Sequence, residues 1–501
     1  MVSDAEFDPH KTQSPPLAAY QSLLFSRLLT YESQAAGVIG ADLALSLPEQ
    51  PDPLEFIVRL NQSATWPDGG VLGGRTVTAE DVKFSIERQR DGDVTFVRRP
   101  QWLNIESIDA VSPDTVSIKT AEPRATTLHQ LADVHSFIVA PESAEAGFGA
   151  NQQPGSGPFL AVEWNERLFA SAVANRRWFG GSERPYLDGI SVEQPRDAVE
   201  VEASLRTKKL DVAFVDRPVA DRLRTVIPEL VEVPAGLADF FGMRFFLPES
   251  PYDDVRVRTA LALSIDRREM IRTLFADSGE VNPWVSWPIT RWSLPQAELS
   301  TMPGYRPGAA GRAEDIGEAR ALLDAYRADN ELPESLDLLV VDEAERSLGL
   351  GSIIRDQVDR ALTLKVNVVA LPLTEIVTRL LNQQAPWVAG PDSGWIDLDD
   401  WLYPYFHSEG TKNSFAIRDE DLDSLIITQR TELDPARRQE TGFEIQRRLL
   451  ELNAGINFVS ERVIALAWPY VRSFPLDATD GFQGRLADCW LDRSDSTFEG
   501  R

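Results

Sequence analysis

The length of the chain rules out a fold built on one hydrophobic core. Its 501 residues exceed the roughly 250 to 300 residues at which single cores stop growing and chains divide into domains. With 43% hydrophobic and 26% charged residues, the composition is that of an ordinary folded protein rather than a disordered one. We therefore expect about two or three folded domains.

The first 150 residues show both strand and helix patterns. Every second residue of the segment 54–60 is apolar, at Leu54, Phe56, Val58 and Leu60. This alternation predicts a strand with one face in a core. Thr78 and Asp81 have the spacing of a capping box, so we expect a helix to begin at about Thr78. Around residues 112–114 a turn separates two further predicted strands.

The remainder of the chain continues as mixed α/β. The glycine- and proline-rich segment 152–158 predicts a connection between domains, followed by a strand pair over 159–173. A core helix is predicted from apolar residues at helical spacing, namely Val257, Ala260, Leu261, Ser264 and Ile265. Asp253 and Asp254 precede it as capping acids, and a second helix is expected from Asp434 to a stop at Gly455.

The chain is strongly acidic. Its formal net charge is −28 and its pI is about 4.6. Such a chain repels phosphate backbones and anionic lipids, so nucleic acid is not expected as a partner. The charge is interpreted either as a solubilising surface or as a field that attracts cationic ligands.

Common catalytic and metal-binding motifs are missing from the sequence. It contains no nucleophile elbow, zinc-protease motif, phosphate-binding loop or dinucleotide fingerprint. A single cysteine, Cys489, excludes an intrachain disulfide. The four histidines are scattered, which disfavours a multi-histidine metal site. We expect no metal, no cofactor and no catalytic residues.

Neither a membrane span nor an export signal is predicted. No run of about 18 apolar residues occurs, and the first residues lack the basic and apolar regions of a signal peptide. The chain as given therefore carries no predicted export address.

The segment 394–403 has the most unusual local composition, because it combines three acids with aromatic residues. One interpretation is a ligand site in which the aromatic faces and a carboxylate bind a cationic or amphipathic molecule. The other is that the acids cap a helix whose aromatic residues enter the core. The residues in question are Trp395, Asp397, Asp399, Trp401 and Tyr403.

Several segments, in order along the chain, are similar to motifs of one known protein family. The first of them are the segment 7–10 (FDPH), residues 66–69 (WPDG) and residues 76–85 (TVTAEDVKFS). Residues 155–159 (GSGPF) and 175–188, which contain RRWFG and PYLD, follow, and the segment 254–267 (DVRVRTALALSIDR) is the last. Together these segments resemble the extracellular solute-binding proteins of family 5, which serve ABC importers of peptides and nickel chelates.

This resemblance implies a two-lobed α/β periplasmic-binding-protein fold, with an extra inserted domain and mixed sheets flanked by helices. Lobe I is expected to comprise residues 1–40, 157–245 and 466–501, with the inserted domain at 41–156 and lobe II at 246–465. A ligand would be held between the lobes, and the closed form would be recognised by a membrane permease.

The resemblance also implies ligand contacts. Gly394-Trp395 matches a family pair whose tryptophan lines the cleft, and Asp397, Asp399 and Trp401 follow in the same loop. Arg99 and Trp102 are similar to a cleft pair of the nickel-binding branch, with a surface Arg and a packed Trp as the alternative. The loop after Trp395 is shorter than in peptide-binding members, which places a peptide ligand in doubt.

These features predict the substrate-binding component of an ABC importer, not an enzyme. The expected solute is peptide-like, a metal chelate, an oligosaccharide or an amine-bearing compound. We expect a monomer in the periplasm or at the cell surface. The alternatives are a cytosolic ligand-sensing domain of the same fold, or a hydrolase that uses Asp397 and Asp399.

Overall fold

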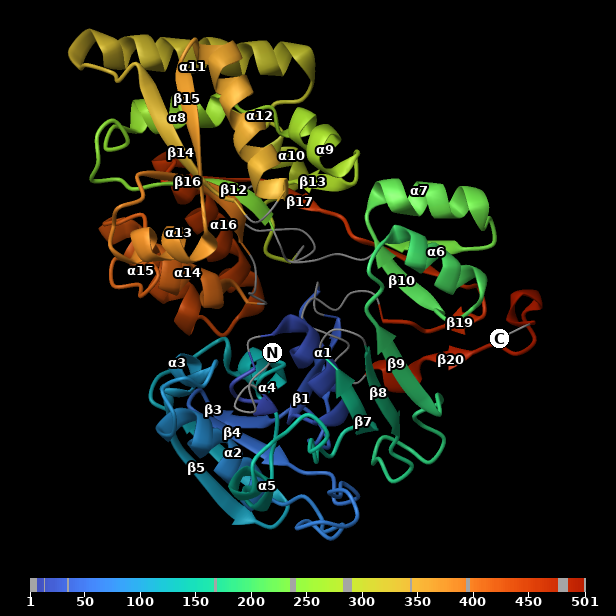
Figure 1. Ribbon diagram of the computed structural model, residues 1–501. Helices are drawn as coiled ribbons and strands as arrows, with labels where there is room; N and C mark the ends of the chain where they lie inside the picture. The colour runs from blue at the N-terminus through green and yellow to red at the C-terminus, as the bar shows by residue number, and fades with distance from the viewer. Residues whose placement is uncertain are drawn as a thin grey trace. The chain divides into compact units, whose positions relative to one another are not determined.

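The computed structural model of the chain (Figure 1) forms two compact units. It describes residues 7–12, 14–33, 36–165, 169–234, 240–282, 291–342, 345–392, 397–475 and 485–499. Unit 1 comprises Met1–Val215, Val219–Ala235 and Ile464–Arg501, and unit 2 comprises Asp216–Pro218 and Gly236–Val463. The division into five segments of two lobes, expected from the resemblance, stays a prediction.

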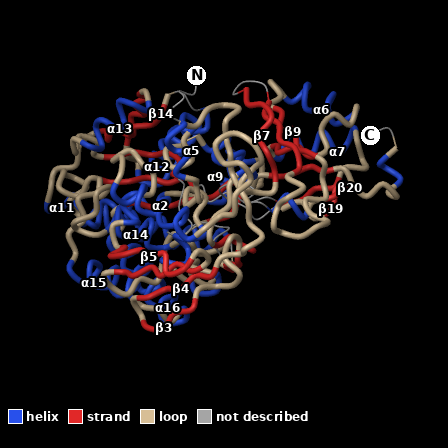
Figure 2. Tube along the Cα trace, turned by 90° about the horizontal axis from the view of Figure 1, so that it is seen from below, coloured by secondary structure: helices blue, strands red, loops and turns tan. Residues whose placement is uncertain are grey.

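One antiparallel sheet organises the first part of unit 1. Its strand order is β3 (Glu49–Asp52), β4 (Glu55–Arg59), β6 (Thr115–Thr120) and β5 (Ile105–Ser112). Strands β3, β4 and β5 of this sheet are labelled in Figures 1 and 2, and β6 lies between β4 and β5. Phe56 and Val58 are buried as the alternation predicted, whereas Leu54 is 37% exposed because it precedes the strand.

A helix covers this sheet and begins where its capping box predicted. Helix α2 (Ala79–Asp91) packs against β5 and β6. The Asp81 carboxylate accepts a hydrogen bond from the Thr78 N–H at 2.8 Å and pairs with Arg75 at 2.6 Å. The cap therefore also ties the helix start to the preceding loop.

Short helices and four further small sheets complete the described part of unit 1. The helices are α1 (Pro15–Leu24), α3 (Arg99–Trp102), α4 (Thr127–Ala132), α5 (Pro141–Ala146), α6 (Ala198–Arg206) and α7 (Arg217–Val226), the last starting at the boundary with unit 2. The strands are β1 (Leu29–Ser33), β2 (Val38–Ala41), β7 (Phe159–Asn165), β8 (Phe169–Ala174), β9 (Gly189–Glu193), β10 (Val212–Val215), β11 (Val231–Pro234), β18 (Ile464–Ala467), β19 (Val471–Arg472) and β20 (Trp490–Leu491).

Strand β18 is the central strand of a three-stranded sheet. It pairs antiparallel with β10 on one side and with β11 on the other. Between β11 and β18 the chain forms most of unit 2. The central strand β18 therefore begins about 230 residues after the end of β11, the strand of this sheet that precedes it in the chain.

The segment 152–158 packs tightly inside unit 1. The Gly157 N–H donates to the Leu24 carbonyl at 2.8 Å. A Cβ placed at Gly155 would lie 2.0 Å from the same carbonyl oxygen. The predicted strand pair follows as β7 and β8. These glycines therefore serve a close backbone approach.

Unit 2 is built on a six-stranded mixed sheet with helices on both faces. The strand order is β13 (Gly279–Val281), β17 (Gly455–Glu461), β12 (Phe240–Phe245), β16 (Trp387–Asp392), β14 (Ser335–Val341) and β15 (Lys365–Leu371). The helices are α8 (Val255–Ser264), α9 (Arg267–Phe275), α10 (Gln296–Leu299), α11 (Gly308–Asp329), α12 (Glu345–Leu362), α13 (Leu373–Leu381), α14 (Leu398–Phe406), α15 (Glu420–Thr431) and α16 (Pro435–Leu452).

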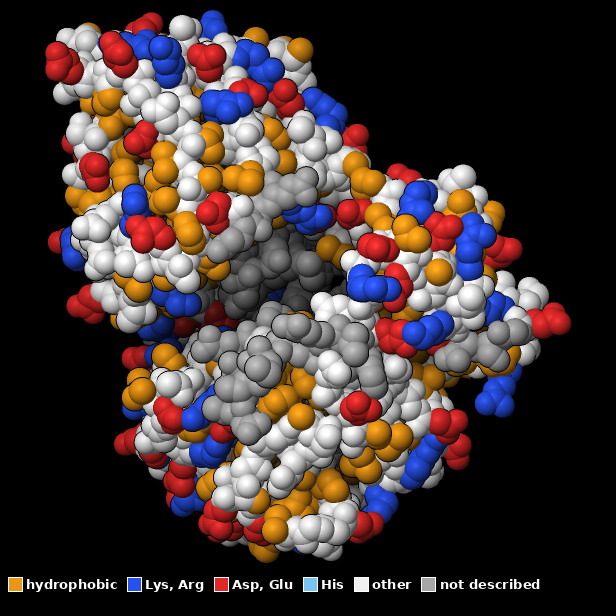
Figure 3. Space-filling model, viewed as in Figure 1, with side chains coloured by type: hydrophobic (Ala, Val, Ile, Leu, Met, Phe, Trp, Pro, Cys, Tyr) orange, Lys and Arg blue, Asp and Glu red, His pale blue; other side chains and the backbone are white. Residues whose placement is uncertain are grey.

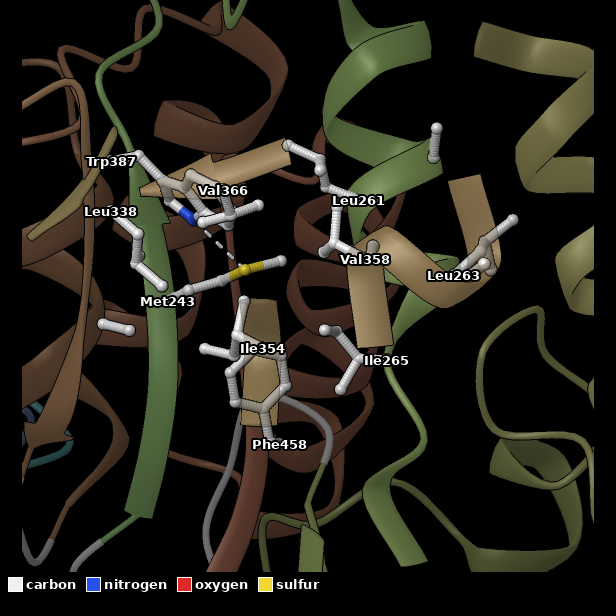
Figure 4. Close-up of a cluster of buried hydrophobic side chains, with 14 of the residues drawn as sticks. Met243, Leu261, Leu263, Ile265, Leu338, Ile354, Val358, Val366, Trp387 and Phe458 are labelled. Atoms are coloured by element: carbon white, nitrogen blue, oxygen red, sulfur yellow. Dashed lines mark hydrogen bonds between the residues drawn. The ribbon is translucent and has the colours of Figure 1, made fainter. Parts of the chain in front are cut away.

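The largest core lies between the sheet and helices α8, α9, α11 and α12. Figure 4 shows Met243 and Trp387 at its centre, where the indole N–H points to the Met243 sulfur at 3.3 Å. The opposite face of the sheet is covered by α13 to α16, with Phe240 in that second core. Successive residues of β12 thus point to opposite faces of the sheet and pack into two different cores, as expected for a central strand.

Both helices predicted in this part of the chain are confirmed. The Asp254 side chain caps α8 by accepting a hydrogen bond from the Arg256 N–H at 2.8 Å. Helix α16 begins after Asp434 as predicted, but it ends at Leu452 rather than at Gly455. Asn453 adopts the left-handed conformation that terminates the helix, a role that Gly usually fills and Asn sometimes fills.

Replacing Asp254 by alanine is expected to lower the free energy of unfolding by about 1 kcal/mol, because the first turn of α8 loses its capping acceptor. Asp253→Ala at the neighbouring position is the matched control. Asp253 is exposed, and its replacement removes the same charge without removing the capping acceptor. Urea denaturation of both variants measures the difference. Equal losses would show that charge rather than capping is responsible.

Candidate functional site

The segment singled out by its composition is described from Asp397 onward. Trp395, the residue expected to line a ligand site, lies outside the described residues. Helix α14 starts directly after Asp397 and carries the other three residues of interest, Asp399, Trp401 and Tyr403. These four residues therefore belong to one element of unit 2.

Asp397 is buried and paired with two arginines. Its side chain caps α14 by accepting a hydrogen bond from the Asp399 N–H at 3.0 Å. The Arg438 Nη1 donates to it at 2.9 Å, and the Arg291 Nη2 lies 3.6 Å away. Burial alone lowers the pKa of Arg438, but the attraction of Asp397 outweighs it and the pKa is raised. The charge of Asp397 is therefore compensated within unit 2.

Asp399 is likewise engaged inside the unit. Its carboxylate accepts hydrogen bonds from Gln429 Nε2 at 2.8 Å and from Arg430 Nε at 2.9 Å. The Arg430 guanidinium lies over the Tyr403 ring, 3.7 Å from its centroid, and Tyr403 stacks on His407 at 4.4 Å. Carboxylate, guanidinium and two rings thus form one continuous contact chain.

Trp401 is a core residue. It is 1% exposed and makes edge-to-face contacts with Phe406 at 4.7 Å and with Phe240 at 6.2 Å between ring centroids. The arrangement matches the alternative in which the acids cap a helix and the aromatic residues enter the core. A ligand role for these residues stays a prediction.

A cavity of about 210 Å³ borders Trp401 between the sheet and α13. Gly242 of β12 and Gly390 of β16 face each other across the strand pair at its floor. A Cβ added at Gly390 would meet nothing within 4 Å. Because both residues are glycines, no side chain fills the space where the sheet borders the cavity, and a small part of a ligand has room there.

Arg244 brings a positive charge to the wall of this cavity. Its guanidinium lies over the rings of Tyr405 and Phe415, at 5.6 and 5.7 Å from their centroids. Burial lowers its pKa. The sequence interpretation missed Arg244, although a charged residue inside the apolar strand 240–245 was the available signal.

The two residues expected in unit 1 lie on the short helix α3, which packs against α2. Trp102 is 1% exposed, and its indole N–H has no hydrogen-bond partner in the described part of the chain. The Nε of Arg99 is equally unpartnered there. A buried donor without an acceptor is a place where water or a ligand gains a hydrogen bond. The ligand role of both residues stays a prediction.

Metal-ligand groups, the single thiol and helix length bear on other functions of the described residues. Across the described ranges, no three His, Cys, Asp or Glu side chains are grouped so as to hold a metal ion. Cys489 is buried, and that burial raises the pKa of its thiol to about 12, so the thiol is protonated at neutral pH. Among the described helices, none has the length and apolar character to cross a bilayer.

Acidic and basic side chains are interspersed over the face shown in Figure 3. Ion pairs between charged side chains of this chain include Arg256 with Asp329 at 3.0 Å and Arg379 with Glu375 at 2.8 Å. This mixture is typical of a solubilising surface, which was one of the two interpretations of the net charge.

Solved structures of binding proteins share this fold. AgaA of A. tumefaciens R10, in complex with agropinic acid, matches with a TM-score of 0.73 and 20% identity over 98% of this chain and 97% of that one. NikZ of Campylobacter jejuni, in complex with Ni(L-His), matches with a TM-score of 0.72 and 18% identity over 93% and 92%. The expected mixed α/β periplasmic-binding-protein fold is confirmed.

The family model of the bacterial extracellular solute-binding proteins, family 5 (middle), matches residues 39–413 of the sequence. The chain belongs to this family. A putative ABC transporter peptide-binding protein of Brucella ovis is 25% identical over 264 residues, which are 51% of this chain and 48% of that protein. The alignment therefore spans about half the length of this curated relative.

Proposed function

We propose that this chain is the substrate-binding component of an ABC importer and captures a small solute without changing it chemically. The observation that carries the proposal is the family match over residues 39–413. Binding proteins act by holding a solute in one conformational state that a partner recognises. Capture of the solute between the two units stays a prediction from the family resemblance.

The charges around α14 narrow the class of solute. Asp397 and Asp399 each contact arginine side chains inside unit 2. Their negative charge is therefore already compensated, which disfavours either residue as the anchor of a cationic group. We propose peptide-like, opine-like or chelate solutes that bring their own carboxylates, for which Arg244 and Arg99 are the candidate partners.

A thermal-shift screen of the purified chain tests the proposal. The panel comprises short peptides, oligosaccharides, opine-like compounds and nickel chelates. We expect saturable stabilisation by one class, and unchanged solute recovered by mass spectrometry, because a ligand that binds only the folded state raises its melting temperature. Turnover of the solute would contradict capture without chemistry.

Replacing Trp395 by alanine is expected to weaken binding of the identified solute by about 1 to 3 kcal/mol, as loss of an aromatic anchor does. Isothermal titration calorimetry measures the affinity. Trp490→Ala is the matched control, because Trp490 is a 41% exposed tryptophan of unit 1. Unchanged affinity in the Trp395 variant would mean that the site lies elsewhere.

Two other functions remain distinguishable from transport. A cytosolic ligand sensor of the same fold would be found in the cytosolic fraction of the native host, whereas we propose a periplasmic or cell-surface location. A carboxylate-dependent hydrolase would need a free acid and base, and the arginine contacts of Asp397 and Asp399 argue against that use.

The proposed partners are the solute and the membrane permease of an importer. We propose that the chain acts as a monomer and does not bind nucleic acid, since its net charge of −28 repels phosphate backbones. Size-exclusion chromatography with light scattering measures the oligomeric state.

A further inference from the structure

A second cavity of unit 2, of about 500 Å³, is bordered by five arginines. It lies between the start of α9, the segment 296–306 and the first turns of α11, elements that are labelled in Figure 1. None of the residues of α14 takes part. The chain has a net charge of −28, so a cavity lining rich in positive charge calls for a physical reason.

Helix α11 opens onto this cavity without a side-chain cap. Its N-cap is Pro307, which makes no side-chain hydrogen bond, and its first turn contains no acidic residue. Gly308 and Ala309 of that turn border the cavity. The N-terminus of this 22-residue helix, with its unpaired N–H groups and the positive end of the helix dipole, therefore borders the cavity. Both features favour binding of an anion there.

Arg267 provides an independent observation. It borders the cavity, is 5% exposed and lies over the Tyr305 ring at 4.1 Å from the centroid. Its Nη1 donates to the Gly304 carbonyl at 2.6 Å. Its Nε has no hydrogen-bond partner within the described residues. Arg267 also forms no ion pair within the described residues, and a buried cation without a counter-charge is stabilised by an anion that binds beside it.

Three more arginines add positive charge that no carboxylate pairs with directly. Arg268 and Arg272 are exposed and one turn apart on α9, a spacing at which like charges repel. Neither forms an ion pair in the described ranges. Arg312 donates to the carbonyls of Leu263 and Ser264 at the end of α8 rather than to an acid.

The acids nearby pair with the fifth arginine, Arg306. It contacts Asp315 at 2.5 Å, Glu318 at 3.3 Å and Glu314 at 3.4 Å, while Asp266, which also borders the cavity, caps α9. The other four arginines of the described lining have no carboxylate partner among the described residues, and their charge is the excess that an anion would compensate. Glu269 of α9 pairs with Arg360 at 2.5 Å.

We propose that this cavity binds a small phosphate monoester, with the phosphate held by Arg267, Arg268, Arg272 and the first turn of α11. Guanidinium forks and helix N-termini both match phosphate oxygens. The volume exceeds that of inorganic phosphate and falls in the range of ligand sites, roughly 300 to 1,000 Å³. The organic part of the ligand packs on Val281, Leu299 and Ile316, which also border the cavity.

Calorimetric titration of the full chain tests the site. The probes are inorganic phosphate, a hexose 6-phosphate and citrate, with sodium chloride at matched ionic strength as the baseline. We expect saturable binding, with the hexose phosphate tighter than inorganic phosphate and both weakened by added salt. Absence of saturable binding by either phosphate would overturn the proposal. So would citrate binding tighter than the hexose phosphate.

The double variant Arg268→Gln and Arg272→Gln is expected to bind the hexose phosphate at least about tenfold more weakly, because two charge-assisted contacts are lost. Both side chains are exposed, so the fold is retained. The control, Arg355→Gln with Arg379→Gln, removes the same charge from one exposed and one half-buried position outside the cavity. Equal weakening in the control would show a general charge effect and overturn the site.

The anion site stands apart from the proposed capture of a solute. Trp395→Ala is expected to leave the affinity for the hexose phosphate unchanged, since no residue of α14 is in the described lining of the cavity. Parallel loss of phosphate binding in that variant would contradict a separate site. If the importer hypothesis alone is wrong, the measured affinity for the hexose phosphate is still expected to be the same.

Discussion

Replacing Arg438 by methionine is expected to lower the free energy of unfolding by about 3 to 5 kcal/mol, the largest effect of any single exchange around α14. Arg438 is 3% exposed and pairs with Asp397, which is 1% exposed. Removal of the guanidinium takes away the nearer of the two arginines that compensate the buried carboxylate, and Arg291 lies farther away at 3.6 Å. Chemical denaturation followed by tryptophan fluorescence measures the loss.

A double variant separates charge from packing. Asp397→Asn together with Arg438→Met removes both charges, so we expect it to recover a large part of the loss, because the uncompensated charge is then gone. If the double variant is as unstable as Arg438→Met alone, the loss comes from packing against Trp292, whose ring lies 4.8 Å from the guanidinium.

Replacing Gly155 by alanine is expected to destabilise unit 1 by about 3 kcal/mol or more, at the upper end of overpacking effects. The added Cβ would lie 2.0 Å from the Leu24 carbonyl oxygen and 2.9 Å from the Phe25 Cα. Both atoms are backbone, so no side-chain rotation relieves the overlap. Thermal unfolding of the variant measures the effect.

Gly149→Ala is the matched control for this exchange. The nearest atom to a Cβ at Gly149 is the Gln152 Cβ, at an ordinary contact distance of 4.0 Å. We expect a change within about 0.5 kcal/mol. Similar losses in both variants would indicate that the backbone freedom of glycine in this loop, and not the approach to Leu24, is what matters.

Local features of the fold could be predicted because their causes are local. The burial of Phe56 and Val58 follows from alternation, and the starts of α2 and α8 follow from Thr78 and Asp254. The end of α16 was placed too late, because Asn453 takes the left-handed conformation before Gly455 is reached.

The candidate site could be predicted only in part, because its contacts join distant positions. Asp397 pairs with Arg438, which is 41 residues away in the sequence. No local sequence pattern around either residue predicts this pair. The cavity at Arg244 requires strands β12 and β16 to pair with Gly242 opposite Gly390. Such pairings depend on the topology of the sheet, which local patterns do not determine.

The place of β18 between β10 and β11 has a consequence for biosynthesis. While the ribosome is still making residues 236–463, β10 and β11 expose open backbone edges, because their shared neighbour does not yet exist. Unit 2 is already complete in sequence when Ile464 is added, so it can fold first. Maturation of unit 1 therefore waits for a late segment, and a nascent chain stalled before residue 464 is the form most exposed to aggregation and most in need of a chaperone.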